Sequence, residues 1–271
     1  MSSIFATGVS GTIGKHFKNQ VFPINYDLRN SELRNIPDFK IGDCILHAAA
    51  VVGPESVSKD RITSHKVNVE ASKMLAQFAK DNGVSRFIYV STSHVYARSN
   101  SLLTELSPTD PSNIYAEQKF EAEGEISLIF RDCPEKLCIV RVFSVLDWDV
   151  ADFTLGGGIK KLISDNSNFT LNYGDDIRDF LTPRLIAHAL VCIANEALLT
   201  GIINLSTGTG LTVKDAAKIM LEGSGYKLPA NRIVSGNSEY PYVVGDNSKL
   251  KKALPDLNLK WKPSRLINPI T

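Results

Sequence analysis

A tyrosine and a lysine stand four positions apart in the segment Tyr115-Ala-Glu-Gln-Lys119. On a helix, this spacing would place both side chains on one face. A free tyrosine has a pKa of about 10, too high for a base at neutral pH, but a neighbouring lysine would favour the phenolate. The spacing therefore predicts an acid–base pair, although helices also carry such pairs on their surfaces by chance.

Hydroxyl side chains end an apolar segment upstream of this pair. The segment Arg86–Ser91 has the composition of a buried strand, and Thr92 and Ser93 follow it directly. In parallel α/β sheets, ligands bind beyond the carboxyl ends of the strands. A hydroxyl there could hold a substrate oxygen while the tyrosine exchanges its proton, or it could bond only to the backbone.

Three evenly spaced glycines, Gly8, Gly11 and Gly14, follow the apolar segment Ile4–Thr7. Glycine permits a tight turn and a close approach of the backbone to a diphosphate, and the amides at the start of a helix would face that anion. The order of strand, glycine loop and short helix predicts a dinucleotide-binding loop. A simple turn is the alternative.

Short apolar segments alternate with longer helical patterns along the chain. Nearly continuous apolar strands are typical of a parallel sheet that is covered on both faces. We expect strands at 4–7, 44–50, 86–91, 137–142 and 201–206, and helices at about 66–81, 113–131 and 183–198. The predicted fold class is α/β, a doubly wound parallel sheet of the Rossmann type with a smaller C-terminal substrate-binding region.

The regular alternation weakens after Val145, where Gly156-Gly157-Gly158 has the composition of a loop. We therefore expect a domain boundary near residue 144. Residues 1–143 would form the dinucleotide-binding domain, to which a helix and a strand at about 183–206 return. Residues 144–182 and 207–271 would form the smaller region.

Composition excludes several classes of protein. Thirty Lys and Arg residues against 29 Asp and Glu give a net charge of +1, which disfavours a nucleic-acid binder and a polybasic membrane anchor. The sequence has neither a long apolar span nor a signal-peptide pattern. Four cysteines without a C-x-x-C pair indicate reduced thiols in a cytoplasmic protein. The five histidines show no paired ligand spacing, so we expect no metal.

Together, these features resemble the extended short-chain dehydrogenase/reductase family, of the NAD-dependent epimerase/dehydratase type. The glycine loop resembles the family's T-G-x-x-G-x-x-G motif, and Tyr115 and Lys119 fall on its Y-x-x-x-K pair. Other matches are D-L-R-N at 27–30, H-A-A-A at 47–50, V-N-V at 67–69 and S-T-S-H-V-Y at 91–96. The resemblance implies Thr92, Tyr115 and Lys119 as catalytic residues. It also implies that NAD or NADP is bound by Gly8, Ser10, Gly11, Thr12, Ile13, Gly14, Asp27, Leu28, Ala48, Ala49, Ala50, Asn68, Tyr115 and Lys119.

Motifs in the second half bear on the substrate. G-D-D-I-R-D-F at 174–180 resembles a motif whose arginine clamps a diphosphate, a task that suits the planar guanidinium, although a surface Arg–Asp pair is the alternative. The segments 204–208 and 245–250 resemble later family motifs. The resemblance implies hydride transfer at C4 of a nucleotide-linked sugar held by Ser93, Ser144, Arg178 and Asp246. It further implies a homodimer formed through the helices at 66–81 and 113–131.

Two departures from the family pattern matter. Only twelve residues separate Gly14 from Asp27, too few for the usual full helix and second strand, so that 21–25 would be what remains of that strand. If Asp27 contacts the adenine, no clear residue reads the ribose, which predicts poor discrimination between NAD and NADP. Ser144 also replaces an asparagine in the family's R-x-F-N turn.

Other functions remain open from the sequence. Epimerases and reductases share the same catalytic residues. A reductase of a small non-nucleotide carbonyl compound would not need Arg178, which is typical of diphosphate recognition. A catalytically idle sensor or scaffold on the same fold is a further alternative, because a fold does not determine a function.

Overall fold

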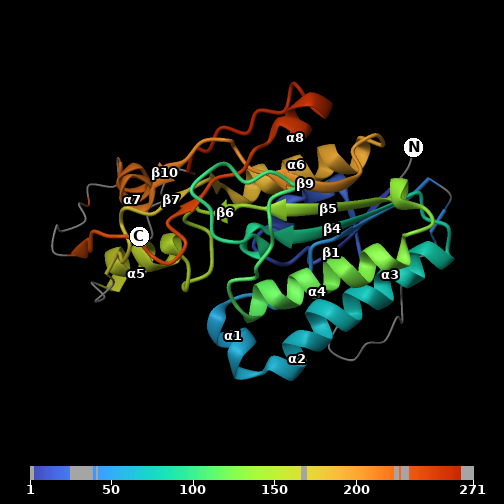
Figure 1. The fold of residues 1–271 in the computed structure, drawn as a ribbon, viewed down its shortest axis with the longest axis horizontal. Helices are drawn as coiled ribbons and strands as arrows, with labels where there is room; N and C mark the ends of the chain where they lie inside the picture. The colour runs from blue at the N-terminus through green and yellow to red at the C-terminus, as the bar shows by residue number, and fades with distance from the viewer. Residues whose placement is uncertain are drawn as a thin grey trace.

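A six-stranded parallel sheet forms the centre of the computed structural model, which describes residues 3–24, 39–40, 42–165, 170–222, 226 and 232–263 (Figure 1). Its strand order is β2-β1-β3-β4-β5-β9. The bounds are β1 Ile4–Thr7, β2 Phe22–Pro23, β3 Cys44–His47, β4 Arg86–Thr92, β5 Leu137–Val142 and β9 Gly201–Leu205. All neighbouring strands pair in parallel, so the predicted doubly wound sheet is confirmed.

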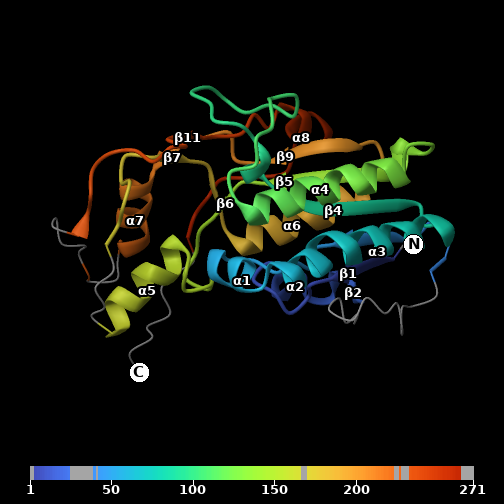
Figure 2. The same cartoon turned by 60° about the horizontal axis from the view of Figure 1, so that its bottom comes forward.

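Helices cover both faces of this sheet (Figure 2). Helices α1 (Pro54–Lys59) and α2 (Arg61–His65) lead through a π-helical turn, Lys66–Glu70, into α3 (Ala71–Asp81), which lies beside α4 (Ile114–Ile129). Helix α6 (Pro183–Asn195) covers the opposite face. Successive residues of β3 and β4 pack on opposite faces of the sheet and so belong to two different hydrophobic cores. Ile45 and Phe87 pack with α3 and α4, whereas Leu46 and Ile88 pack with α6.

The main helices agree with their predicted positions. The helix expected at 66–81 is present, with its first turn π-helical, and it stops before Gly83, whose φ is +68°. Asn113 caps α4 because its side chain accepts a hydrogen bond from the Ala116 amide. Helix α6 and strand β9 also lie within the ranges expected for the returning elements. No helix among the described residues is long and apolar enough to cross a membrane.

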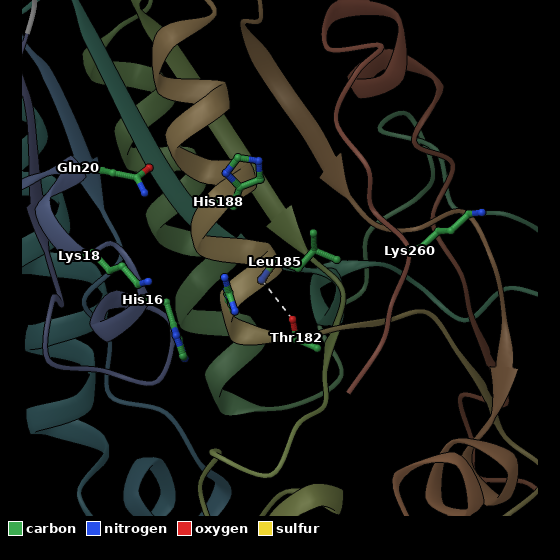
Figure 3. A pocket seen from close by; sticks show the side chains of 8 residues that line it. His16, Lys18, Gln20, Thr182, Leu185, His188 and Lys260 are labelled. Atoms are coloured by element: carbon green, nitrogen blue, oxygen red, sulfur yellow. Dashed lines mark hydrogen bonds between the residues drawn. The ribbon is translucent and has the colours of Figure 1, made fainter. Parts of the chain in front are cut away.

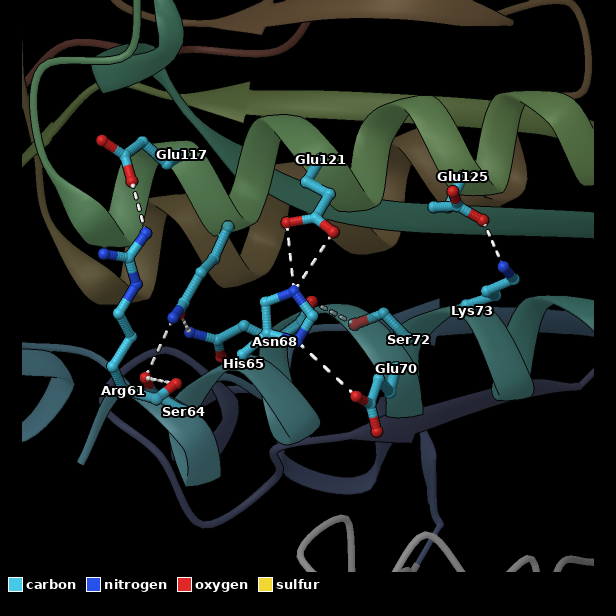
Figure 4. Close-up of polar contacts among 11 residues, drawn as sticks. Arg61, Ser64, His65, Asn68, Glu70, Ser72, Lys73, Glu117, Glu121 and Glu125 are labelled. Carbon is cyan, nitrogen blue, oxygen red and sulfur yellow. Dashed lines mark hydrogen bonds and ion pairs between the residues drawn. The ribbon is translucent and has the colours of Figure 1, made fainter.

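Ion pairs join α4 to α2 and α3 along their solvent side (Figure 4). They run from Arg61–Glu117 at 3.3 Å through His65–Glu121 at 3.1 Å to Lys73–Glu125 at 2.5 Å. Exposed pairs of this kind add little stability. Their regular spacing does fix the register between the helices, and α4 carries Tyr115 and Lys119.

The remaining elements gather beyond the carboxyl ends of the strands (Figure 1). Strands β7 (Ile177–Arg178), β10 (Leu211–Thr212) and β11 (Tyr242–Val243) form one small sheet, and β6 (Ser144–Val145) pairs with β8 (Phe180–Leu181). Helices α5 (Leu155–Asp165) and α7 (Val213–Leu221) share an apolar core with residues such as Trp148 and Phe180. Helix α8 (Ser248–Ala253) contacts β9. The domain boundaries given above stay a prediction.

Two local expectations need correction. Gly156-Gly157-Gly158 does not form a loop but lies in the first turn of α5. A Cβ on Gly156 would stand 2.1 Å from the carbonyl oxygen of Asp147, so close packing requires glycine in this helix. The glycine loop is followed not by a short α-helix but by two 3₁₀ turns, Gly14–His16 and Lys18–Gln20. Lys18 has a φ of +52°, which interrupts helical continuation, and β2 is the expected short remnant of a second strand.

Candidate active site

The glycine loop forms a tight turn at the carboxyl end of β1. The Gly11 amide donates to the Gly8 carbonyl at 3.0 Å, and a Cβ on Gly14 would stand only 2.0 Å from that carbonyl oxygen. Gly8 has a φ of +71°, and a Cβ there would meet the Ala49 amide nitrogen at 2.7 Å. Added Cβ atoms at Gly8 and Gly14 would collide with the backbone of Ala49 and of the loop itself, so this tight turn requires glycine at both positions.

A buried polar chain connects this loop to α3. The Thr7 hydroxyl lies 2.6 Å from His47 Nδ1, and His47 Nε2 lies 2.8 Å from the Ser72 hydroxyl. Burial, and then the positive charge of Lys119, lowers the pKa of His47 to about 3. The neutral ring therefore holds the ends of β1 and β3 together, and Thr7 also accepts the Ala49 amide at 3.2 Å. This histidine is packed, and the sequence did not reveal its partners.

Asn68 uses its amide group within the protein. Its Oδ1 accepts the Val51 amide at 2.8 Å, and its Nδ2 donates to the Val51 carbonyl and to Gln118 Oε1 (Figure 4). Both donors are thus occupied, so Asn68 fixes the segment that follows Ala48–Ala50. Its role toward a cofactor stays a prediction. Asp27 and Leu28, the other cofactor-binding residues expected from the sequence, lie outside the described residues.

The three catalytic candidates come from two packed elements. Thr92 ends β4, whereas Tyr115 and Lys119 lie in the first two turns of α4, which packs on β4 and on the 3₁₀ turn Ser93–Val95. The Thr92 hydroxyl accepts the His94 amide at 3.3 Å. The strand-end hydroxyls, Thr92 and the buried Ser93, are thereby placed beside the start of the helix that carries the tyrosine.

Burial makes the charged forms of both α4 residues unfavourable. It raises the pKa of Tyr115 to about 12. It lowers the pKa of Lys119 to about 7, against the opposing influence of Glu123. Lys119 is 2% exposed, and its ammonium group lies 3.9 Å from the centre of the Tyr89 ring. Lys119 is thus a buried side chain and Tyr115 a half-buried one, and the catalytic role of the pair stays a prediction.

A buried ion pair joins Glu123, one turn after Lys119 on α4, to Arg141 on β5. Arg141 Nη2 and Nε contact the two carboxylate oxygens of Glu123 at 2.6 and 3.1 Å, and the Ser91 hydroxyl donates to the same carboxylate. The Arg141 guanidinium also stacks on the Tyr96 ring at 4.6 Å. The Tyr96 hydroxyl donates to Asn204 at 2.6 Å. This network joins β4, β5, β9 and α4, and sequence reasoning missed it.

Arg178 lies on β7 with its guanidinium held in place. It donates to Asp176 at 2.7 Å and to the Ile177 carbonyl at 3.0 Å. Burial lowers the pKa of Arg178, with Asp176 acting in the opposite direction. His94 follows Thr92 by two residues, and desolvation by the surrounding protein, followed by the positive charge of Arg178, lowers its pKa. The positive charge of Arg178 therefore acts on the turn Ser93–Val95, which follows β4.

The other two substrate-side candidates lie on segments near β7. Ser144 is on β6, and its amide donates to the Asp179 carbonyl at 2.9 Å. Asp246 accepts the Ser248 amide at 2.7 Å at the start of α8, and this bond lowers its pKa. Asp179, next to Arg178, is fully buried and accepts bonds from Thr207 and Gly208. That carboxylate orders the loop after β9 and is not available for a ligand.

Comparisons with known proteins agree with this architecture. Residues 4–206 match the model of the NAD dependent epimerase/dehydratase family. A bifunctional protein of Pachysolen tannophilus is 24% identical over 99% of this chain and 47% of its own length. The UDP-glucose 4-epimerase of Corynebacterium glutamicum is 25% identical over 81% of this chain and 70% of its own length.

A solved structure shows the same fold. RMD from Pseudomonas aeruginosa, complexed with NADPH, has a TM-score of 0.79 and 19% sequence identity, covering 97% of this chain and 95% of that chain. The chain spans about half the length of the first two curated relatives that it matches, 47% and 56%. These similarities bear on fold and family, and the roles of single residues rest on the geometry above.

Proposed function

Because the chain belongs to the NAD dependent epimerase/dehydratase family, we propose that it is an NAD(P)-dependent oxidoreductase or epimerase acting on a nucleotide-linked sugar. The reaction is hydride transfer at C4 of the sugar, with Tyr115 as general acid and base. The observation that carries this proposal is the placement of the half-buried Tyr115 and the buried Lys119 on α4, which packs against β4 and the turn that follows it. Similarity to a UDP-glucose 4-epimerase supports the substrate class.

The glycine loop is suited to the diphosphate of a dinucleotide, because it is a tight turn at the carboxyl end of β1 that side chains at Gly8 and Gly14 would disrupt. We assign Gly8, Ser10, Gly11, Thr12, Ile13 and Gly14 to this role, with Ala48–Ala50 beside them. The nicotinamide, when bound, accepts or returns the hydride. Its oxidised form is cationic and would favour a phenolate at Tyr115.

The protein's own residues then move the proton. As hydride leaves C4, Tyr115 takes the proton of the C4 hydroxyl, and a ketone forms there. Lys119 stabilises the phenolate electrostatically, and Thr92 holds the same sugar oxygen by a hydrogen bond. When the hydride returns, Tyr115 gives the proton back. Return to the same face restores the sugar, whereas return to the opposite face produces its C4 epimer.

Arg178 is assigned to the diphosphate of the substrate, and Ser93, Ser144 and Asp246 are assigned to further contacts with the substrate. Arg178→Ala should weaken nucleotide-sugar binding by about 10–150-fold, because a charge-assisted hydrogen bond is worth about 1.5–3 kcal/mol. Cofactor binding should change little. Calorimetry with UDP-glucose and other nucleotide sugars measures both effects. The matched control is Arg131→Ala, an exposed arginine beyond the end of α4.

Two outcomes would count against this assignment. Equal affinity of wild type and Arg178→Ala would remove Arg178 from the substrate site. If the wild type binds no nucleotide sugar, a reductase of a small non-nucleotide carbonyl compound becomes the better account.

We also propose that the chain forms a homodimer through α3 and α4. Ile126 and Ile129 pack into the core, so the exposed apolar residues of α4 are Phe120 and Leu128, which are 38% and 62% exposed. Light scattering should give a dimer at micromolar concentration. Leu128→Lys should shift it toward monomer, and the exposed Leu106→Lys should not. A monomeric wild type would contradict the proposal.

A further inference from the structure

A basic cavity lies outside the site described above. It has a volume of about 460 Å³, within the range of small-molecule sites. Its walls come from three segments: the 3₁₀ turns after the glycine loop, the first turns of α6, and the chain near Lys260 (Figure 3). Figure 3 shows His16, Lys18 and Gln20 on one side and the α6 residues Leu185 and His188 next to them. Tyr115 and Lys119 lie on α4, which covers the other face of the sheet.

The charge of this cavity has one sign. Lys18, Arg184 and Lys260 carry permanent positive charges, but Figure 3 shows the Lys260 side chain directed away from Lys18 and α6. His16 and His188 also line the cavity, and burial lowers the pKa of His16. No carboxylate is among the lining residues of the described chain. None of the described acidic residues forms an ion pair with the three permanent cations. Two carboxylates, Asp149 and Asp147, lie near enough to His16 to oppose the lowering of its pKa by burial. Asp149 pairs with Lys15 at 2.7 Å, and Asp147 accepts the Trp148 amide.

The backbone adds to the positive potential. Helix α6 is 13 residues long and begins at the cavity, with Thr182 as its cap and lining residue. The amino end of a helix carries a partial positive charge. Arg184, in the first turn, is near enough to His16 to influence its pKa. Cations from two separate segments therefore face one volume, an arrangement that costs electrostatic energy unless an anion is present.

The shortened segment after the glycine loop accounts for the opening. Two 3₁₀ turns and the left-handed Lys18 occupy the short stretch between the glycine loop and β2. The turn Gly14–His16 still contacts α6, and the chain beyond it turns away to β2. This leaves the amino end of α6 accessible beside the lysine.

We propose that this cavity is a second anion site, which binds a small phosphate-bearing molecule between residues 16–18 and the start of α6. Lys18 and Arg184 would hold the phosphate oxygens, with His16, His188 and Thr182 as further donors. The site is distinct from the diphosphate cradle of the glycine loop, whose residues it does not share. It does not depend on the proposed function.

Calorimetric titration with inorganic pyrophosphate tests this site. The experiment uses the full chain with saturating NADH, so that the glycine loop is already occupied. We expect a site whose affinity falls at least tenfold in the double variant Lys18→Gln/Arg184→Gln and stays unchanged in Arg178→Ala, which removes the proposed substrate diphosphate site. The exposed Lys252→Gln, on α8, is the matched control and should bind as the wild type does. All substituted side chains are exposed, so unfolding midpoints should stay the same.

The outcomes of this titration distinguish the proposed anion site from the cofactor site at the glycine loop. Equal affinity of wild type and double variant for pyrophosphate would overturn the proposal. An absence of heat in the wild type up to about 10 mM pyrophosphate would also overturn it, because a binding free energy weaker than about −3 kcal/mol does not define a site. If neither NADH nor NADPH binds, the proposed function fails. The comparison between wild type and double variant still decides the second site, because Lys18 and Arg184 lie outside the glycine loop.

Discussion

Replacing Tyr115 by phenylalanine should reduce turnover by about 10²–10⁴-fold, the usual loss when one general acid or base is removed. The substitution deletes only the hydroxyl, and the ring keeps its place at the start of α4. Cofactor affinity and the unfolding midpoint should therefore stay close to wild type. Single-turnover hydride transfer, followed by nicotinamide absorbance, measures the effect.

Matched variants separate proton transfer from general damage. Tyr173→Phe removes a hydroxyl from an exposed tyrosine and should leave turnover unchanged. Thr92→Val should cost less than Tyr115→Phe, because water can partly replace a hydroxyl that only orients the substrate. Turnover of Tyr115→Phe within about threefold of wild type would remove Tyr115 from the general acid–base role.

Breaking the buried Glu123–Arg141 pair should have the largest effect on stability. Arg141→Met leaves the buried Glu123 carboxylate hydrogen-bonded to the Ser91 hydroxyl but without the guanidinium that neutralises it, and it removes the stacking on Tyr96. Loss of one member of a buried pair costs about 3–5 kcal/mol. Urea denaturation should show this decrease in the free energy of unfolding.

A double variant tests the cause of that decrease. Glu123→Gln/Arg141→Met removes both charges, and it should recover a large part of the loss because no uncompensated carboxylate remains. Arg61→Met breaks the exposed pair with Glu117 and should cost about 1 kcal/mol or less. If Arg141→Met were as mild as Arg61→Met, the buried pair would not hold β5 to α4.

Much of the fold could be predicted because each central element has a strong local pattern. The apolar segments around Ile45 and Ile88 fit only buried strands, and the stripe on α3 has helical spacing. Gly156 misled the prediction. Glycine is on average unfavourable in helices, but at this position the Asp147 carbonyl lies so close that a residue with a Cβ atom does not fit.

The sequence alone could predict only those parts of the candidate site that lie within one short motif. The glycine loop and the Tyr115/Lys119 spacing belong to this class. Glu123 and Arg141 are 18 residues apart on a helix and a strand, and only the folded chain shows that their charges are buried together. The partners of His47 and the basic cavity beside α6 likewise depend on contacts between distant segments.

Transfer of an isotopic label tests the central claim most directly. The protein is loaded with NAD or NADP and mixed with a panel of nucleotide sugars deuterated at C4, and the recovered cofactor is analysed by mass spectrometry. The account predicts that deuterium from C4 of at least one of these sugars appears on the reduced nicotinamide, and that Tyr115→Phe slows this transfer by about 10²–10⁴-fold. A cofactor that remains unlabelled with every sugar of the panel would contradict the account.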